Sequence, residues 1–292
     1  MKEKRCAYLT MDSTDGWEID TDLSFEPMQA LGWSIDMVPW RSIGVDWNQY
    51  KAVYICTPWD YPDDPETFLA LLKEIDKSSA VLVNDISLVY WTISKTYLRD
   101  LELRGADIVP SLWYDGFDSE LLPAFFDAYK TDKIIVKPVT GTNAHNTFLL
   151  DRNVPEKIVF NLQKTFEKHK FIVQPFIKNV QIEGEYSLFF FSNKFSHAIL
   201  KTPKEKDFRV QEEHGAYIIS IKPEKDLLET AATVLKLVEP VPVYARCDFI
   251  RAPDGRFLLM ELEVIEPSLY FRMNSKAAGR FALEFDTYVA LQ

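Results

Sequence analysis

Two apolar, strand-like runs near the C-terminus are joined by a tight-turn sequence. They comprise residues 244–250 and 257–265, and the segment between them contains Pro253 and Gly255. Proline presets φ and glycine tolerates a positive φ, so this segment favours a turn. The pattern predicts a β-hairpin, which strongly constrains how the C-terminal part of the chain folds.

Charged side chains of this hairpin are expected to share one face. Alternation along a strand places Arg246 and Asp248 together, and likewise Glu261 and Glu263. A four-residue loop would set Arg246 opposite Glu261, with Asp248 diagonal to it. Carboxylates crowded in this way raise one another's pKa unless a cation holds them ionised. Hard oxygen ligands suit Mg²⁺, with Mn²⁺ as the alternative, and Mg²⁺ usually meets substrate phosphates.

Composition narrows the class of protein. The chain has 292 residues and a net charge of −11, which argues against generic binding to nucleic acid or anionic membranes. Its cysteines, Cys6, Cys56 and Cys247, lie in apolar runs without metal-ligand spacing, as reduced core residues do. The N-terminus has no apolar signal core, and no run reaches transmembrane length. We therefore expect a cytoplasmic protein. A homodimer is expected only because symmetric dimers are the commonest assemblies.

Strands and helices alternate in the first ninety or so residues. Strand-like runs and one helical run occur at residues 5–10, 34–39, 52–57, 65–77 (helical) and 81–84. This alternation predicts βαβ units and a parallel sheet. A further helix is predicted at residues 92–103, closed by Gly105.

The rest of the chain mixes strands with two further helices. Strands are predicted at residues 133–137, 171–174, 186–191, 194–200 and 217–221, and helices at residues 155–169 and 224–238. The overall class is therefore α/β, or α+β.

Two lysines and a polar loop are candidates for binding an anion. Lys95 lies near the start of the predicted 92–103 helix, where free amides and the helix dipole favour anions. Lys137 ends a buried strand, a costly position unless its head meets an anion or water. Residues 140–147 are rich in hydroxyl and amide groups and could place backbone amides over phosphates. The alternatives are two ordinary solvated lysines and a plain surface loop.

Three further segments carry polar groups next to strands. Pro175 follows Gln174 and lacks an amide donor, so neighbouring backbone groups are available to an adenine edge, or the segment only crosses between domains. Glu185, or less favourably Glu183, begins a strand where it could accept ribose hydroxyls. The planar guanidinium of Arg209 can donate two parallel hydrogen bonds to a phosphate or a carboxylate. Lys201 could point into the same space, and an exposed salt-bridge network is the alternative.

In this order, the residues resemble the ATP-grasp superfamily. The resemblance covers roughly residues 53–272 and is nearest to the glutathione-synthetase-like branch, which includes the O-ureido-serine cyclo-ligase of cycloserine biosynthesis. The pieces that carry it are residues 59–61, 195–201, 208–215 and 261–268. It implies an ATP-grasp fold with an N-terminal βαβ domain at residues 1–93. Two α+β subdomains, residues 94–176 and 177–292, would grip ATP.

The resemblance also implies a role for each candidate residue. The residues implied to bind ATP are Lys95, Lys137, Thr140, Gly141, Thr142, Asn143, Gln174, Phe176, Ile177 and Glu185. The residues implied to bind Mg²⁺ are Asp248, Glu261 and Glu263. The residues implied to act on the phosphoryl group or orient the substrate are Arg209, Arg246 and Lys201. The residues implied to shape the substrate pocket are Trp59, Asp60, Tyr61 and Ser268.

The activity implied is carboxylate–amine ligation of small, amino-acid-like molecules, driven by ATP through an acyl phosphate. Two features depart from the superfamily's pattern. Glu263 stands where an asparagine is frequent, and the 140–147 loop has few glycines. An ATP-binding regulatory protein, a phosphotransferase acting on a hydroxyl, and an unrelated α/β protein with a structural cation are the alternatives.

Overall fold

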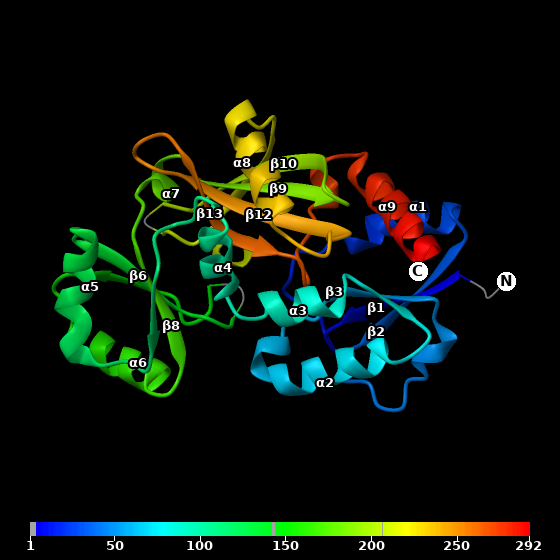
Figure 1. Ribbon diagram of the computed structural model, residues 1–292, viewed down its shortest axis with the longest axis horizontal. Helices are drawn as coiled ribbons and strands as arrows, with labels where there is room; N and C mark the ends of the chain where they lie inside the picture. Colours follow the sequence, from blue (N-terminus) through cyan, green and yellow to red (C-terminus); the bar gives the residue numbers. More distant parts are fainter. Residues whose placement is uncertain (1–3, 142–143, 206) are drawn as a thin grey trace.

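The computed structural model describes residues 4–141, 144–205 and 207–292. Within these residues the chain forms three sheets, each built from a separate stretch of sequence (Figure 1). The N-terminal sheet lies at one end of the molecule, the sheet of residues 112–175 lies at the other, and the five-stranded C-terminal sheet lies between them. The mixed α/β class predicted from the sequence is confirmed.

The N-terminal sheet is parallel, with strand order β2-β1-β3-β4, which confirms the predicted βαβ pattern. Its elements are β1 (Lys4–Thr10), α1 (Phe25–Ala30), β2 (Trp33–Pro39), β3 (Ala52–Thr57), α2 (Pro65–Asp76), β4 (Val81–Val83) and α3 (Ile86–Thr92). Short 3-10 turns lie at Thr21–Ser24, Trp47–Gln49 and Tyr61–Asp63. Asp64 caps α2 by accepting from the Thr67 amide, and Pro65 occupies the first turn.

The middle sheet is antiparallel, with strand order β5-β8-β6-β7. Its elements are β5 (Leu112–Asp115), a 3-10 turn (Ser119–Leu121), α5 (Leu122–Tyr129), β6 (Lys133–Pro138), β7 (Phe148–Asp151), α6 (Glu156–Phe166) and β8 (Lys170–Pro175). Phe125 and Phe126 of α5 and Phe166 of α6 pack with Phe171 of β8 in one buried cluster. The two helices therefore cover one face of this sheet (Figure 1).

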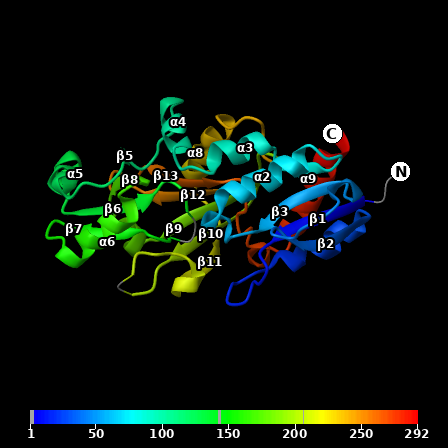
Figure 2. The same ribbon diagram turned by 90° about the horizontal axis from the view of Figure 1, so that it is seen from below.

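The C-terminal sheet is antiparallel, with strand order β11-β10-β9-β12-β13. Its strands are β9 (Glu185–Phe191), β10 (Lys194–Thr202), β11 (Tyr217–Ile221), β12 (Tyr244–Arg251) and β13 (Phe257–Glu263). The helices and turns of this part are α4 (Tyr97–Leu103), α7 (Asn179–Ile182), α8 (Lys225–Lys236), α9 (Ala277–Leu291), Glu212–His214 and Phe271–Met273. Helices α4 and α8 lie on the same side of this sheet (Figure 2) and pack into one core with β9, β12 and β13.

Helix α9 joins the C-terminal sheet to the N-terminal one. Phe281 of α9 contacts Tyr54 of β3, with ring centroids 5.2 Å apart, and shares a core with Phe191 of β9. Asn84, directly after β4, donates to the Tyr244 carbonyl at 2.9 Å from a fully buried position. These contacts bind the two sheets into one frame beside the site described below.

The proposed division into residues 1–93, 94–176 and 177–292 stays a prediction. Each sheet falls within one of these ranges. Helix α4 belongs by sequence to the second range, yet it packs on the sheet of the third. Contacts in the core therefore cross the sequence boundary at this helix.

The prediction of one helix at residues 92–103 is wrong. Helix α3 ends at Thr92 and α4 begins at Tyr97, and Lys95 lies in the turn between them. The Lys95 amide donates to the Val139 carbonyl at 2.7 Å, a tertiary contact that replaces a helical hydrogen bond. The break places Lys95 beside the end of β6.

The predicted hairpin is confirmed, but its predicted register is wrong. The loop is one residue longer than expected, and a bulge interrupts the ladder just after Asp248. Asp248 consequently lies opposite Glu261, and Arg246 lies opposite Glu263. The shared charged face survives this shift because directly paired residues still point to the same side.

No helix in the described ranges is both long and apolar enough to span a membrane. Cys6, Cys56 and Cys247 are buried and form no disulfide with one another, which agrees with their predicted place in the core. Burial raises the pKa of each thiol. These cysteines therefore contribute to packing.

Candidate active site

A cavity of about 250 Å³ lies where the three parts of the chain meet. Its wall includes Lys137 and Gln174 of the middle sheet, Lys201 and Asp248 of the C-terminal sheet, and Trp59 from the segment after β3. The sheet faces covered by helices are apolar, whereas the face of the C-terminal sheet toward the cavity carries charges. The sequence-predicted candidates from distant segments therefore converge on one space.

One buried ion pair lies at the β9–β10 side of this face. Lys201 is paired directly with Glu185 across the strands, and Lys201 Nζ lies 2.6 Å from Glu185 Oε1. A Cβ on Gly184 would come within 2.5 Å of the Lys201 carbonyl oxygen, so a glycine is needed where β9 begins. Burial disfavours the charged lysine, but Asp248 and Glu185 outweigh it and raise the pKa of Lys201. Lys201 therefore stays charged.

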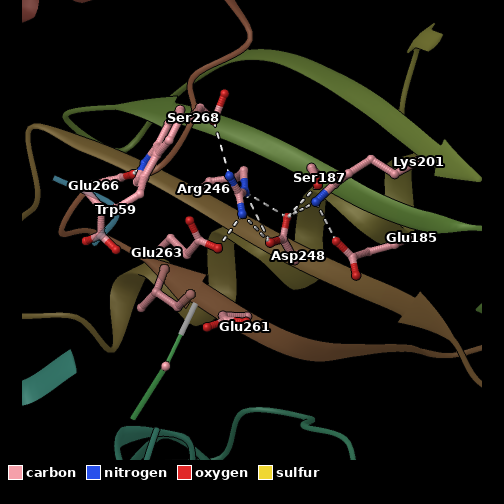
Figure 3. A network of polar contacts seen from close by, with 12 residues as sticks. Trp59, Glu185, Ser187, Lys201, Arg246, Asp248, Glu261, Glu263, Glu266 and Ser268 are labelled. Atoms are coloured by element: carbon pink, nitrogen blue, oxygen red, sulfur yellow. Dashed lines mark hydrogen bonds and ion pairs between the residues drawn. The ribbon is translucent and has the colours of Figure 1, made fainter. Parts of the chain in front are cut away.

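Asp248 is the centre of a second buried network (Figure 3). Its carboxylate accepts from Arg246 Nε at 3.1 Å and from the Ser187 hydroxyl of the neighbouring strand. Arg246 also donates to Glu263 and to the Ser268 carbonyl. Burial raises the pKa of Asp248, but Arg246 and Lys201 outweigh it, so the net pKa falls below the ordinary value. Burial raises the pKa of Glu263 to about 7, against the attraction of Arg246.

Two lysines approach the same network from the side of β6. Lys95 Nζ lies 2.8 Å from Glu261 Oε1 and donates to the Gly141 carbonyl at 2.7 Å. Lys137 is half-buried in the cavity wall, and among the described residues its ammonium has no hydrogen-bond or ion-pair partner. Burial lowers the pKa of Lys137, an effect that Glu261 opposes and Lys95 increases. An anion in the cavity would satisfy this lysine.

The three acids predicted to bind metal, Asp248, Glu261 and Glu263, line this one cavity. In the ranges that the structure describes, no group of three acidic, histidine or cysteine side chains is arranged to hold a metal ion. Arg246 and Lys95 hold these carboxylates instead. Their hard oxygen atoms are of the kind that Mg²⁺ prefers, and a phosphate that drew Lys95 away would release Glu261.

The residues predicted to meet adenine also line the cavity, namely Gln174, Phe176 and Ile177. Gln174 is buried and donates from its amide to the Ser111 hydroxyl at 2.8 Å. The Phe176 ring meets the Phe208 ring edge-on, with centroids 6.4 Å apart. Together they form an apolar wall with one polar group, as a flat heterocycle requires.

The structure separates the two acids considered for ribose. Glu185 lies in the cavity wall, whereas Glu183 pairs with Arg251 at 2.9 Å outside it. The sequence preference for Glu185 over Glu183 therefore agrees with their positions. The ion pair of Glu185 with Lys201 places it next to the charged network.

Arg209 lies at the cavity wall and is held by a two-point contact. Its Nε and Nη2 lie 3.1 and 2.9 Å from the two oxygens of Asp207, and this contact lowers the pKa of Asp207. Gly141 of the predicted phosphate loop lines the cavity, whereas Thr140 lies outside the wall. The predictions for Thr142 and Asn143 fall outside the described residues.

The candidates of the N-terminal part divide into two groups. Trp59 and Tyr61 line the cavity, as does Ser268 from the C-terminal part. Asp60 points elsewhere, because its carboxylate accepts from Trp40 Nε1 at 2.7 Å and pairs with Arg41. The structure therefore does not bring Asp60 to the site.

Two residues that the sequence reasoning did not propose also line the cavity, Trp17 and Glu266. The rings of Trp17 and Trp59 lie 5.1 Å apart, and Trp59 Nε1 donates to the Glu266 carbonyl at 2.9 Å. Burial, and then the neighbouring Glu263, raise the pKa of Glu266 well above its ordinary value. Its sequence signal is a third acid in the apolar run that follows the hairpin.

Comparison with known proteins agrees with this architecture. Residues 6–84 match the family model described as the N-terminal domain of D-cycloserine synthetase DcsG. The cycloserine biosynthesis protein DcsG of Streptomyces lavendulae is 25% identical over 289 residues, covering 92% of this chain and 95% of that protein. The similarity thus extends well beyond the N-terminal sheet.

Solved structures show the same fold. The crystal structure of D-cycloserine synthetase DcsG superposes with a TM-score of 0.87 at 25% identity, covering 98% of this chain and 99% of the other. The D-alanine–D-alanine ligase of Bacillus anthracis, solved with ATP, gives 0.68 at 12% identity over 99% and 98%. The ATP-grasp ligase PsnB, solved with Mg and ADP, gives 0.65 at 14% identity over 98% of each chain. The chain therefore has the ATP-grasp fold and is a DcsG-like protein, similar to D-cycloserine synthetase over nearly its whole length.

Proposed function

We propose that this protein is an ATP-dependent ligase that joins a carboxylate to an amine through an acyl phosphate. The observation that carries the proposal is Lys137, an ammonium without a partner among the described residues, facing Glu261 in a cavity shared with Lys95. Cations beside a carboxylate cluster suit a magnesium–triphosphate complex. The similarity to D-cycloserine synthetase along nearly the whole chain supports the same proposed function.

The nucleotide would lie between the middle and C-terminal sheets. Lys95 and Lys137 would contact its phosphates, because both ammonium groups reach the cavity from the β6 side. Its adenine would meet the wall formed by Gln174, Phe176 and Ile177, and its ribose would lie near Glu185. The described residues of the 140–147 loop that line the cavity are Gly141, Ala144, His145 and Thr147, whereas Thr140 lies outside the wall.

Asp248, Glu261 and Glu263 would hold Mg²⁺, or Mn²⁺ in its place. When bound, the ion neutralises charge on the phosphates and brings the γ-phosphate into line. Glu261 would become available to the ion, because Lys95, which pairs with it in this structure, would contact the phosphates instead. Burial raises the pKa of Glu263 to about 7, so a cation is needed for its full ionisation at neutral pH.

The chemistry needs no nucleophile from the protein. A substrate carboxylate oxygen attacks the γ-phosphorus, ADP leaves, and an acyl phosphate forms. An amine nitrogen, from the same molecule or a second one, then attacks the acyl carbon, and phosphate departs as the amide forms and a proton is lost. Arg209 and Arg246 would neutralise the transferred phosphoryl group and orient the acyl phosphate.

Lys201 would support this machinery by keeping Glu185 and Asp248 ionised and in place. The substrate would lie beside Trp59, Tyr61 and Ser268, which line the end of the cavity nearest the N-terminal sheet. Asp60 is left out of the proposal, because Trp40 and Arg41 hold it elsewhere.

The test is ADP release from Mg·ATP over a panel of amino acids and small carboxylic acids, with hydroxylamine present to trap the acyl phosphate. We expect a hydroxamate with at least one carboxylate. A phosphorylated hydroxyl product without hydroxamate would show a phosphotransferase. ATP binding without turnover on any member would show a nucleotide-binding protein that lacks ligase activity.

A pair of lysine variants assigns the phosphate contact. Lys137→Ala should remove turnover and the rise in melting temperature caused by Mg·ATP, because it deletes an ammonium that has no partner among the described residues. Lys133→Ala is the matched control, since Lys133 begins the same strand but is exposed and pairs with Asp151. Equal behaviour of the two variants would contradict the assignment.

A further inference from the structure

Glu266 differs from the acids of the buried charged network in having no positive partner among the described residues. Glu185 pairs with Lys201, Glu261 pairs with Lys95, and Arg246 holds the two remaining acids of the network. The Glu266 carboxylate makes no hydrogen bond and no ion pair within residues 4–141, 144–205 and 207–292. Each acid of the network thus has a positive partner within the described part of the chain, and Glu266 does not.

Burial makes the charged form of an unpaired carboxylate energetically unfavourable. Glu266 is only 7% exposed and forms part of the cavity wall. A carboxylate taken out of water loses its hydration, so burial favours the neutral acid unless a cation compensates the charge. A buried acid without a positive partner in the wall of a binding cavity is suited to a positively charged group of the ligand.

The surroundings of Glu266 favour a cation. Trp17 and Trp59 line the same end of the cavity, with ring centroids 5.1 Å apart, and Trp59 is fixed by its hydrogen bond to the Glu266 carbonyl. Indole faces attract cations through their negative quadrupole. A carboxylate beside two indoles is therefore a binding site for an ammonium group.

Glu266 lies at the opposite end of the charged face from the Lys201–Glu185 pair. In Figure 3, Arg246 and Glu263 lie between Glu266 and the Lys201–Glu185 pair, and Trp59 lies on the side of Glu266. A small molecule could therefore place an ammonium at Glu266 while its carboxylate points along the sheet toward the phosphate site.

We infer that Glu266, with Trp17 and Trp59, binds the ammonium group of the substrate and so selects zwitterionic, amino-acid-like carboxylates over carboxylates without an amino group. This inference rests on the proposed ligase function. Glu266 acts by ion pairing, and the indoles limit access of water and add a cation–π attraction.

The experiment compares the D and L enantiomers of each amino acid with the corresponding des-amino acid, for example serine with 3-hydroxypropanoate. ADP release with hydroxylamine trapping is measured for the wild type, Glu266→Gln and Glu74→Gln. Glu74 supplies the control because it is an exposed acid on α2 that lies outside the cavity wall. We expect Glu266→Gln to lower kcat/KM for the preferred amino acid roughly 10- to 100-fold, mainly through KM.

The ratio of amino to des-amino substrate separates recognition from a structural role. Glu266→Gln should bring this ratio close to one, and Glu74→Gln should leave it unchanged. A general loss of structure would lower kcat/KM for both substrates by a similar factor. It would also remove the rise in melting temperature caused by Mg·ATP. An unchanged ratio in Glu266→Gln, or a wild type that prefers des-amino acids, would overturn the inference.

Calorimetric binding distinguishes failure of the inference from failure of the proposed function. The same amino acids are titrated into protein that holds a non-hydrolysable ATP analogue. If no panel member supports ADP release, ligase function is refuted. Amino-acid binding that Glu266→Gln weakens would then still support the ammonium site, and its absence would overturn that site too.

Discussion

Replacement of Lys201 by methionine tests whether the charge balance of the cavity holds the C-terminal sheet together. Lys201 is 4% exposed and Glu185 is 7% exposed, and their charged atoms are 2.6 Å apart. Asp248 Oδ1 lies 3.6 Å from the same ammonium. Methionine keeps the length and apolar stem of the side chain, so the change removes mainly the charge.

The expected loss of stability follows from the uncompensated carboxylates. Removal of one partner of a buried ion pair costs about 3–5 kcal/mol, because the other charge remains in a medium of low dielectric constant. Asp248 keeps its contacts with Arg246, so Glu185 accounts for most of this loss. At roughly 2–4 °C per kcal/mol, the melting temperature should fall by about 6–20 °C.

Urea unfolding and thermal melting of four proteins provide the assay. Lys201→Met should be much less stable than the wild type, and Glu185→Gln combined with Lys201→Met should recover a large part of the loss, because no unpaired charge remains. Lys194→Met is the control on the same strand, since the Lys194 side chain is 71% exposed and its pair with Glu284 is worth at most about 1 kcal/mol.

The reasoning is refuted if Lys201→Met destabilises no more than Lys194→Met. It is also refuted if the double variant is less stable than Lys201→Met alone. Either result would mean that water or backbone movement compensates Glu185, and that the pair does not determine the local structure.

Three other predictions follow from single residues. Glu261→Gln should abolish ATP turnover and leave the melting temperature within a few degrees of the wild type; near-normal turnover would contradict the metal assignment. Asn84→Ala should cost about 3–5 kcal/mol in urea unfolding, because it leaves three buried backbone groups without partners, and a loss below about 1 kcal/mol would contradict this role. Burial lowers the pKa of His197 to about 4, so the folded protein holds it neutral. Its contribution is complete above pH 6.5 and is lost as the pH falls toward 4, about 3 kcal/mol in all, and His197→Gln should remove that part of the pH dependence of urea unfolding.

Local chemistry made much of the site predictable. Alternation along a strand has a period of two, so the sequence alone indicated that Arg246 and Asp248 share a face, as do Glu261 and Glu263. The turn residues between them indicated the hairpin. Lys137 was recognisable because a charge at the end of a buried apolar strand is costly without a partner.

The register of the β12–β13 hairpin and the break between α3 and α4 were harder to predict from the sequence. One extra loop residue and one bulge changed which acid lies opposite Arg246, and neither has a strong sequence signal. Lys95 follows an apolar pattern that reads as one helix, but a hydrogen bond from its amide to β6 separates α3 from α4. The strands β5 and β7 are four residues long, too short for a periodic pattern to show.

By itself the sequence determined most of the longer elements, the charged face of the hairpin and the order of the lysines, because these depend on neighbours a few residues apart. The tertiary structure alone decided that Lys137 and Glu261 share one cavity and that Asp60 turns away. It also decided that Glu266 lies beside Trp59 without a positive partner among the described residues. Lys137 is more than a hundred positions from Glu261, and Trp59 more than two hundred from Glu266, so these arrangements depend on how three sheets pack around one cavity. Packing of that kind is a property of the whole chain, which no local pattern encodes.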